Sequence, residues 1–113
     1  MTPDELRALA DRAVACRHWR PMAGMRDLQG RTWTPDLLWR WHPHDRPDLS
    51  DPATMGCLLA LVREAWGDPS LTAAFDYTGW PSWRVGHSED GRGTRGVGDT
   101  EAEALVAALE AAP

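Results

Sequence analysis

Apolar residues recur at helical spacing in three stretches of the chain, over residues 2–15, 51–66 and 100–111. Each stretch begins with a side chain that can accept a hydrogen bond from a free N–H of the first helical turn. These side chains belong to Thr2, Ser50 or Asp51, and Thr100. Within each stretch the Leu, Val, Met and Ala residues return every three or four positions and form one apolar stripe. The pattern therefore predicts three amphipathic helices.

Alternation of apolar and polar positions predicts strands between these helices. Over residues 31–42 four large apolar side chains occupy odd positions, as the period of a strand requires: Trp33, Leu37, Trp39 and Trp41. Pro35 interrupts this stretch, so we expect an edge strand or two kinked segments. A shorter strand is expected over 25–28, and residues 74–98 have the pattern of a hairpin with turn residues at 88–91.

The predicted order of elements is α-β-(β)-α-β-β-α in one domain that spans residues 1–113. Antiparallel hairpins combined with segregated helices are typical of the α+β class, so we expect a small antiparallel sheet of three to four strands packed with three helices. No stretch reaches the roughly 18 apolar residues that a helical membrane span needs. The acidic, polar N-terminus does not have the pattern of a secretory signal. We therefore expect a cytoplasmic protein with no membrane partner.

Three stretches of the chain resemble small proteins of phages and prophages in GC-rich bacteria: Cys16–Met25, Asp48–Gly67 and Gly98–Leu109. Together they cover roughly half of the chain, and they are similar to the set called the phage ABA-sandwich domain. The resemblance implies a helix–sheet–helix sandwich and a phage or prophage gene expressed in a bacterial host cell. It implies no catalytic or binding residues.

Composition and charge narrow the classes of partner. All 12 basic residues are Arg, and Lys, Ile and Asn are absent, which indicates a GC-rich genome rather than an RNA-binding composition. The net charge of −5 argues against a general nucleic-acid binder, because such proteins neutralise phosphates with an excess of basic side chains. An acidic surface is compatible with docking on a basic partner.

Tryptophan is the most unusual component, with seven residues in the chain. Core packing is one interpretation. The other is a binding surface, because Trp and Arg dominate interface energies and Trp can also stack on bases. The residues that we predict to bind a partner are Trp80, Trp39, Trp41, Trp83 and Arg84. Trp80 is the leading candidate because Gly79 and Pro81 present it on a loop. Strand geometry would place Arg40 on the face opposite Trp39 and Trp41.

Histidine and cysteine offer a possible metal site. His42 and His44 have an H-x-H spacing, and Cys16 and His18 have a C-x-H spacing. These four side chains could ligate zinc if the two loops met. The alternative is that the histidines are exposed loop residues and that both thiols, Cys16 and Cys57, are free and half-buried.

The glycine-rich segment 91–98 offers a possible anion site. Its backbone could form a nest for phosphate, with Arg92 and Arg95 as the cations. The alternative is a hairpin tip without a ligand.

No G-x-S-x-G, H-E-x-x-H or P-loop motif is present, so catalysis is not the favoured function. The sequence predicts a phage or prophage accessory protein that binds a host protein, such as a defence component, without a cofactor. A second interpretation is a homo-oligomer, such as a homodimer, that sequesters a nucleotide or other small ligand through Arg84, Arg92 or Arg95. A third is a small metal-dependent enzyme that uses the following residues: His42, His44, Asp45 and His87. A structural role in the virion also stays open.

Overall fold

Helices begin at the capping residues that the sequence predicts. The computed structural model describes residues 1–77, 81–87 and 93–113, and within these its α-helices are α1 (Pro3–Val14), α2 (Pro52–Trp66) and α3 (Glu101–Ala111). In each helix the cap side chain accepts a hydrogen bond from an N–H of the first turn; the caps are Thr2, Asp51 and Thr100. α2 ends at Gly67, whose φ of 63° only glycine adopts without strain. No helix in the described ranges is long and apolar enough to cross a bilayer.

The sheet confirms the α+β class. Its described strands are antiparallel and lie in the order β1 (Thr72–Asp76), β2 (Ser82–Gly86) and β3 (Gly96–Gly98). The register pairs Phe75 with Trp83 and Val85 with Gly96. The predicted pairing of the strand around Trp83 with a short returning strand is therefore confirmed. The predicted turn at 88–91 lies outside the described residues.

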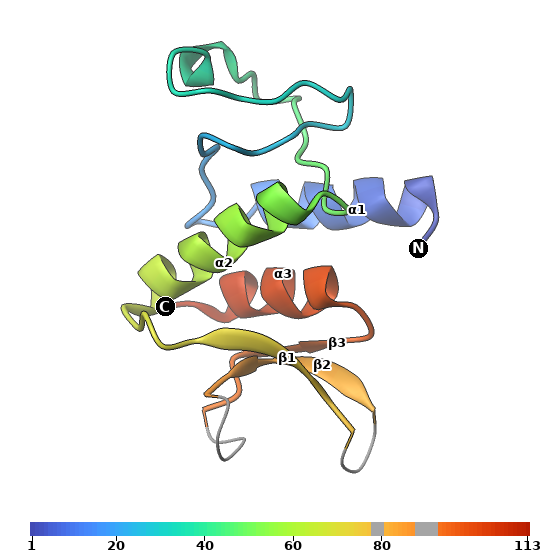
Figure 1. Cartoon of the computed structure of the whole chain (residues 1–113), viewed down its shortest axis with the longest axis vertical. Helices are drawn as coiled ribbons and strands as arrows, with labels where there is room; N and C mark the ends of the chain where they lie inside the picture. Colours follow the sequence, from blue (N-terminus) through green and yellow to red (C-terminus); the bar gives the residue numbers. More distant parts are fainter. Residues whose placement is uncertain (78–80, 88–92) are drawn as a thin grey trace.

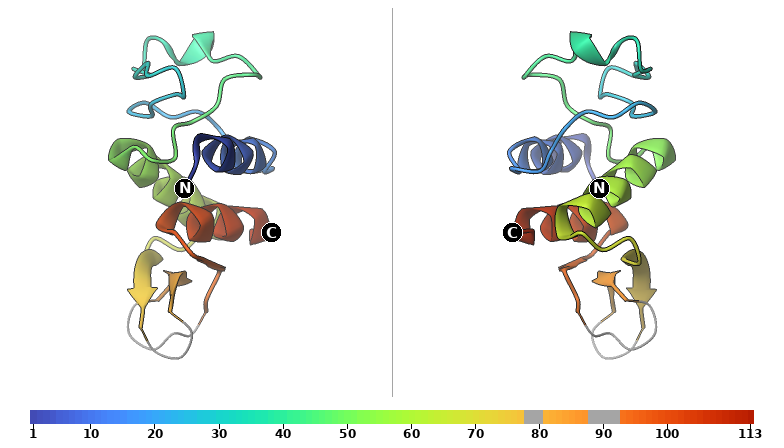
Figure 2. Two further views of the ribbon diagram at one scale, coloured as in Figure 1. Left: turned by 90° about the vertical axis from the view of Figure 1, so that its right-hand side faces the viewer. Right: turned by 90° about the vertical axis from the view of Figure 1, so that its left-hand side faces the viewer.

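The layers are arranged differently from the expected helix–sheet–helix sandwich. The sheet is an outer layer, α3 lies against it, and α1 and α2 pack on the far side of α3 (Figures 1 and 2). The helix therefore buries apolar residues around most of its circumference: Ala102, Ala104, Leu105, Val106, Ala108 and Leu109. A helix that is apolar on nearly all sides is typical of a central layer.

Glycine allows α3 to reach the sheet. A Cβ at Gly96 would lie 2.3 Å from the backbone oxygen of Ala104 and 2.5 Å from the backbone nitrogen of Ala108. A Cβ at Gly98 would lie 2.5 Å from the Cβ of Glu103. Glycine weakens a strand, and here it is required because only a residue without a side chain permits this approach.

Residues 16–50 form a layer beyond α1 and α2 that has little regular structure (Figure 1). We call it the loop layer, and we call the remaining described residues the helix–sheet body. The strand predicted over 31–42 is wrong, because the backbone N–H groups of Leu37, Arg40 and Trp41 close local turns and Leu38–Arg40 form a turn of 3-10 helix, η1. The strand predicted over 25–28 is reduced to isolated bridges, which join Arg26 to Thr32 and Asp27 to Pro47.

A few side chains attach the loop layer to the body. Met25 and Leu49 are buried in the same apolar cluster as the helices. Thr54 of α2 accepts a hydrogen bond from the backbone N–H of Arg26 at 2.9 Å. Arg20 forms a two-pronged ion pair with Glu64 of α2, with N–O distances of 2.6 and 2.8 Å. The attachment is therefore partly apolar and partly ionic.

Candidate functional site

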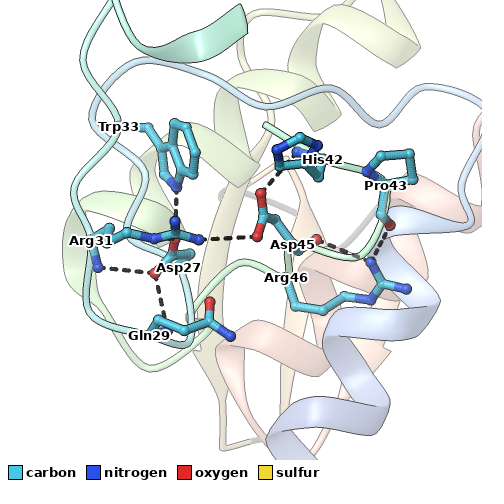
Figure 3. A network of polar contacts seen from close by, with 8 residues as sticks. All are labelled: Asp27, Gln29, Arg31, Trp33, His42, Pro43, Asp45 and Arg46. Atoms are coloured by element: carbon cyan, nitrogen blue, oxygen red, sulfur yellow. Dashed lines mark hydrogen bonds and ion pairs between the residues drawn. The ribbon is translucent and has the colours of Figure 1, made fainter. Parts of the chain in front are cut away.

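A fully buried carboxylate organises the loop layer (Figure 3). Asp27 has no exposed surface. It accepts hydrogen bonds from the backbone N–H groups of Gln29 and Arg31 at 3.0 and 2.9 Å. It also accepts from Arg31 Nε at 2.8 Å and from the indole Nε1 of Trp33 at 3.1 Å. Four donors compensate the carboxylate for lost hydration, as a buried charge requires.

A second buried carboxylate extends this network. Asp45 is 3% exposed and accepts from Arg31 Nη2 at 3.0 Å and from the backbone N–H of His42 at 2.8 Å. One guanidinium, that of Arg31, therefore joins both buried aspartates (Figure 3). The adjacent Arg46 donates from Nε to Asp11 of α1 at 2.6 Å, which links the network to the body. Side-chain hydrogen bonds thus supplement the few backbone hydrogen bonds between segments of this layer.

The tryptophans predicted to share one strand face divide into buried and exposed residues. Trp33 is 4% exposed, and its ring lies 4.9 Å from that of Trp41, which lies 6.2 Å from Trp19. Trp39 is 76% exposed. Around η1 successive side chains are rotated by about 120° rather than alternating, so Trp39 and the following Trp41 do not share a face. Trp41 is consequently half-buried and supports the layer, and Trp39 alone of these three faces solvent.

Arginine side chains lie over two of these rings. The guanidinium carbon of Arg40 is 5.0 Å from the ring centroid of Trp39, and that of Arg31 is 5.2 Å from the ring of Trp33. The expectation that Arg40 points away from Trp39 is therefore wrong, because it assumed a strand. In the described part of the chain no carboxylate pairs with Arg40. Its charge is available to a ligand, and its face is held by a cation–π contact.

These side chains surround an open pocket of about 410 Å³, which we call the Trp39 pocket. The residues that line it are Arg31, Trp33, Leu37, Trp39, Arg40 and His42. The volume falls within the roughly 300–1,000 Å³ of typical ligand sites. Its walls are apolar, and its polar groups are cations or an imidazole. The arrangement can hold an apolar group and an anion together.

Charge is distributed unevenly between the loop layer and the rest of the chain. Residues 16–50 contain six Arg and four Asp, a formal charge of +2, whereas the other residues contain six Arg and thirteen acidic groups, a charge of −7. The Trp39 pocket therefore lies on the basic part of an acidic protein. The net charge suggested a basic partner, but the local charge favours an acidic one.

Two further residues predicted to bind a partner, Trp83 and Arg84, lie far from this pocket. Trp83 and Arg84 are in β2, in the layer at the opposite end of the molecule (Figure 1). Trp83 packs edge-on against Phe75, with centroids 5.9 Å apart, and Arg84 Nε lies 3.0 Å from a carboxylate oxygen of Asp76. The predicted residues therefore do not form one surface. Trp80 lies outside the described residues.

The predicted anion site is described only in part. The guanidinium of Arg95 lies 4.5 Å from the ring centroid of Trp66, and its backbone N–H donates to Val85. Arg92 lies outside the described residues, so this site stays a prediction.

His87 takes part in a contact that sequence reasoning missed. Its Nε2 is 3.0 Å from Asp68 Oδ2 and its Nδ1 is 3.0 Å from Ser70 Oγ. The Ser70 hydroxyl donates to Asp68 Oδ1 at 2.6 Å, so its proton is directed away from the imidazole, unlike that of a nucleophile activated by histidine. Hydrogen bonds from Ser70 lower the pKa of Asp68. The contact closes a loop, and no local spacing in the sequence indicates it.

The histidines predicted to bind metal stack on each other. The rings of His42 and His44 are 5.3 Å apart with an interplanar angle of 6°. His18 instead contacts the backbone oxygen of Pro113 at 2.6 Å. Over residues 1–77, 81–87 and 93–113, no three His, Cys, Asp or Glu side chains gather in a way that could hold a metal ion. The four-residue zinc site is therefore not assembled.

Both cysteines are free and half-buried, as predicted. Burial raises the pKa of the Cys16 and Cys57 thiols. Both thiols are therefore protonated and weakly reactive at neutral pH.

Comparison with known proteins gives no relative: no protein-family model, no curated protein and no solved structure matches this chain. The geometry and charge of the Trp39 pocket are therefore what indicates a function.

Proposed function

We propose that this chain is a non-catalytic binding protein that docks a protein partner through the Trp39 pocket. The observation that carries the proposal is the 76% exposure of Trp39 on a layer held by buried hydrogen bonds. An exposed Trp on an ordered backbone can bury a large area at little cost in conformational entropy. Trp and Arg are also the residues most enriched among interface hot spots.

The wider proposal is that the chain is a phage or prophage accessory protein that acts in the cytoplasm of a bacterial host. Its partner would be a host protein, such as a component of a defence system. The resemblance of Cys16–Met25, Asp48–Gly67 and Gly98–Leu109 to such proteins supports this setting. The absence of recognised catalytic motifs from these residues agrees with a role in binding.

Affinity capture from a lysate of a GC-rich bacterial host tests the proposal. The immobilised wild-type chain is compared with Trp39→Ala and with Tyr77→Ala, a matched control because Tyr77 is 82% exposed on the body. We expect a partner that wild type and Tyr77→Ala retain alike and that Trp39→Ala binds roughly 30-fold more weakly, the effect of losing a hot spot of about 2 kcal/mol. Retention that does not depend on Trp39 would contradict the proposal.

A second candidate function is the binding of a nucleotide or a similar small ligand. The specific observation in its favour is that the pocket of about 410 Å³ combines Trp rings with guanidinium groups, which can stack a base and hold a phosphate. Titration of intrinsic Trp fluorescence with nucleotides tests it. A saturable change that Trp39→Ala abolishes would favour this function, and native mass spectrometry would show whether the binding unit is a homo-oligomer.

A further inference from the structure

We infer that the Trp39 pocket recognises an acidic peptide segment, with a carboxylate held by Arg40 and a neighbouring apolar side chain seated against Trp39 and Leu37. The inference rests on the proposed function and adds the chemistry of the partner. It follows from which charges near the pocket are free and which are already paired.

The two arginines at the pocket, Arg31 and Arg40, differ in whether a carboxylate already pairs with them. Arg31 donates from Nε to Asp27 and from Nη2 to Asp45, so its charge already faces two buried carboxylates. Arg40 contacts the Trp39 ring, and within the described residues it has no carboxylate partner. A guanidinium that stacks through its face keeps the N–H donors along its edge, which match a carboxylate in geometry. Arg40 is therefore the group that can hold an anion.

The carboxylates of the loop layer do not satisfy this cation. Each already accepts hydrogen bonds from neighbouring groups in the layer: Asp27, Asp36, Asp45 and Asp48. Asp36 is exposed, and the hydrogen bond from Thr34 lowers its pKa, so it is ionised at neutral pH. None of these four carboxylates pairs with Arg40. Even with these four carboxylates counted, the loop layer has a formal charge of +2, because it contains six Arg.

The size and walls of the pocket require more than an anion. Trp33, Leu37 and Trp39 contribute apolar surface to a space of about 410 Å³, which a lone carboxylate would leave mostly unfilled. An apolar side chain next to the acid would bury this surface. A long nucleic acid is disfavoured because the rest of the chain carries a formal charge of −7. Charge complementarity thus favours an acidic, partly apolar protein segment.

Nuclear magnetic resonance with two matched peptides tests this inference. The probes are acetyl-Glu-Leu-Glu-amide and acetyl-Gln-Leu-Gln-amide, which differ only in their side-chain charge. In ¹⁵N-labelled protein we expect the acidic peptide to shift the indole N–H resonance of Trp39 and to leave that of Trp66 in the body unchanged. We expect the Gln peptide to bind about tenfold more weakly, since it lacks a charge-assisted hydrogen bond.

The Arg40→Gln variant tests whether Arg40 is the cation that holds the carboxylate of the peptide. It should bind both peptides alike and keep the Trp33 indole resonance at its wild-type position, because Arg40 is exposed and outside the buried network. Equal binding of the two peptides to wild type, or a preference for the acidic peptide that survives in Arg40→Gln, would overturn the inference. A shift of Trp39 by inorganic phosphate alone that matches the peptide's would also overturn it, in favour of a general anion site.

The outcomes separate this inference from the proposed function. Capture of a partner that depends on Trp39, together with equal binding of the two peptides, would overturn the acidic segment and leave the docking surface intact. A preference for the acidic peptide without any captured partner would overturn the protein-docking function. It would still support the binding of a carboxylate in the pocket.

Discussion

The loop layer and the helix–sheet body bury different kinds of side chain. In the body the buried polar residues are the hydroxyl side chains Thr54 and Ser82, and the rest of its buried side chains are apolar. The loop layer buries the carboxylates Asp27 and Asp45. Burial of apolar area is non-directional, whereas a buried carboxylate is favourable only when its donors are correctly placed.

A layer with little regular structure can carry a binding site because hydrogen bonds to buried carboxylates hold its backbone in place. The layer has only a short 3-10 turn and isolated bridges, so its remaining donors need other acceptors, and Asp27 supplies one for Trp33 and Arg31. The bonds of Asp27 hold the turn that contains Gln29 and Arg31, and they fix the buried Trp33. The body contributes a platform, and the carboxylates position the pocket.

The largest effect is expected from removing the buried carboxylate of the loop layer. Asp27→Ala leaves Arg31 and the Trp33 indole without an acceptor, so we expect a loss of about 3–5 kcal/mol in the stability of this layer. Urea unfolding followed by Trp fluorescence should show the loss, and far-UV circular dichroism, which reports the helices, should change less. Asp27→Asn is the matched control and should cost less, because it keeps an acceptor oxygen. Equal changes by both probes would contradict the division into two regions.

The body should be most sensitive to a steric change. Gly96→Ala places a methyl group 2.3 Å from the backbone oxygen of Ala104, so α3 must move away from the sheet. We expect a loss of about 3 kcal/mol, at the upper end for overpacking, in thermal unfolding followed by circular dichroism. Gly56→Ala in α2 is the control, because its methyl meets nothing within 4 Å and should stabilise the helix by up to about 1 kcal/mol. A Gly96→Ala variant as stable as wild type would contradict the close approach of α3.

A smaller effect is expected from acid, at the attachment between the two regions. The hydrogen bond from Arg20 lowers the pKa of Glu64 in the folded chain. The pair therefore contributes its stability above the ordinary carboxyl pKa of about 4.3, and this contribution is lost as the pH falls through the lowered value. Arg20→Gln should reduce the pH dependence of loop-layer unfolding in this acidic range. The control Arg12→Gln, which removes a pair between α1 and α3, should leave that dependence unchanged.

The smallest effect on stability is expected at the proposed binding residue. Trp39 is 76% exposed, so Trp39→Ala should change the free energy of unfolding by no more than about 0.5 kcal/mol. Chemical denaturation of the variant measures this. A loss of several times that size would mean that Trp39 supports the fold, and it would remove the argument that this side chain is reserved for a partner.

The three helices could be predicted from the sequence because their signals are local. A cap, an adjacent proline and an apolar stripe lie within a few residues of one another, as in Thr2, Pro3 and Leu6. The central position of α3 was harder to predict, since it depends on glycines in β3 that admit the helix. Those glycines indicated only a short, weak strand.

The candidate site could be predicted only in part. Trp39 was identified, but the odd positions of the tryptophans indicated a strand and thereby separated Arg40 from it. One local signal argued otherwise, because Thr34 followed by Pro35 repeats the helix-start pattern of Thr2 and Pro3. The role of Asp27 could not be predicted, because its hydrogen bonds to Arg31 and Trp33 depend on a loop geometry without a repeating pattern.

Hydrogen exchange of two indole protons tests most directly whether the buried carboxylate holds the loop layer independently of the body. The Trp33 indole donates to Asp27 in the loop layer, and the Trp66 indole donates to Ala108 in the body at 2.8 Å. In Asp27→Ala we predict that the Trp33 proton exchanges at least about tenfold faster, as expected for local opening, and that the Trp66 proton keeps its wild-type rate. Equal acceleration of both protons, or an unchanged rate at Trp33, would contradict the account.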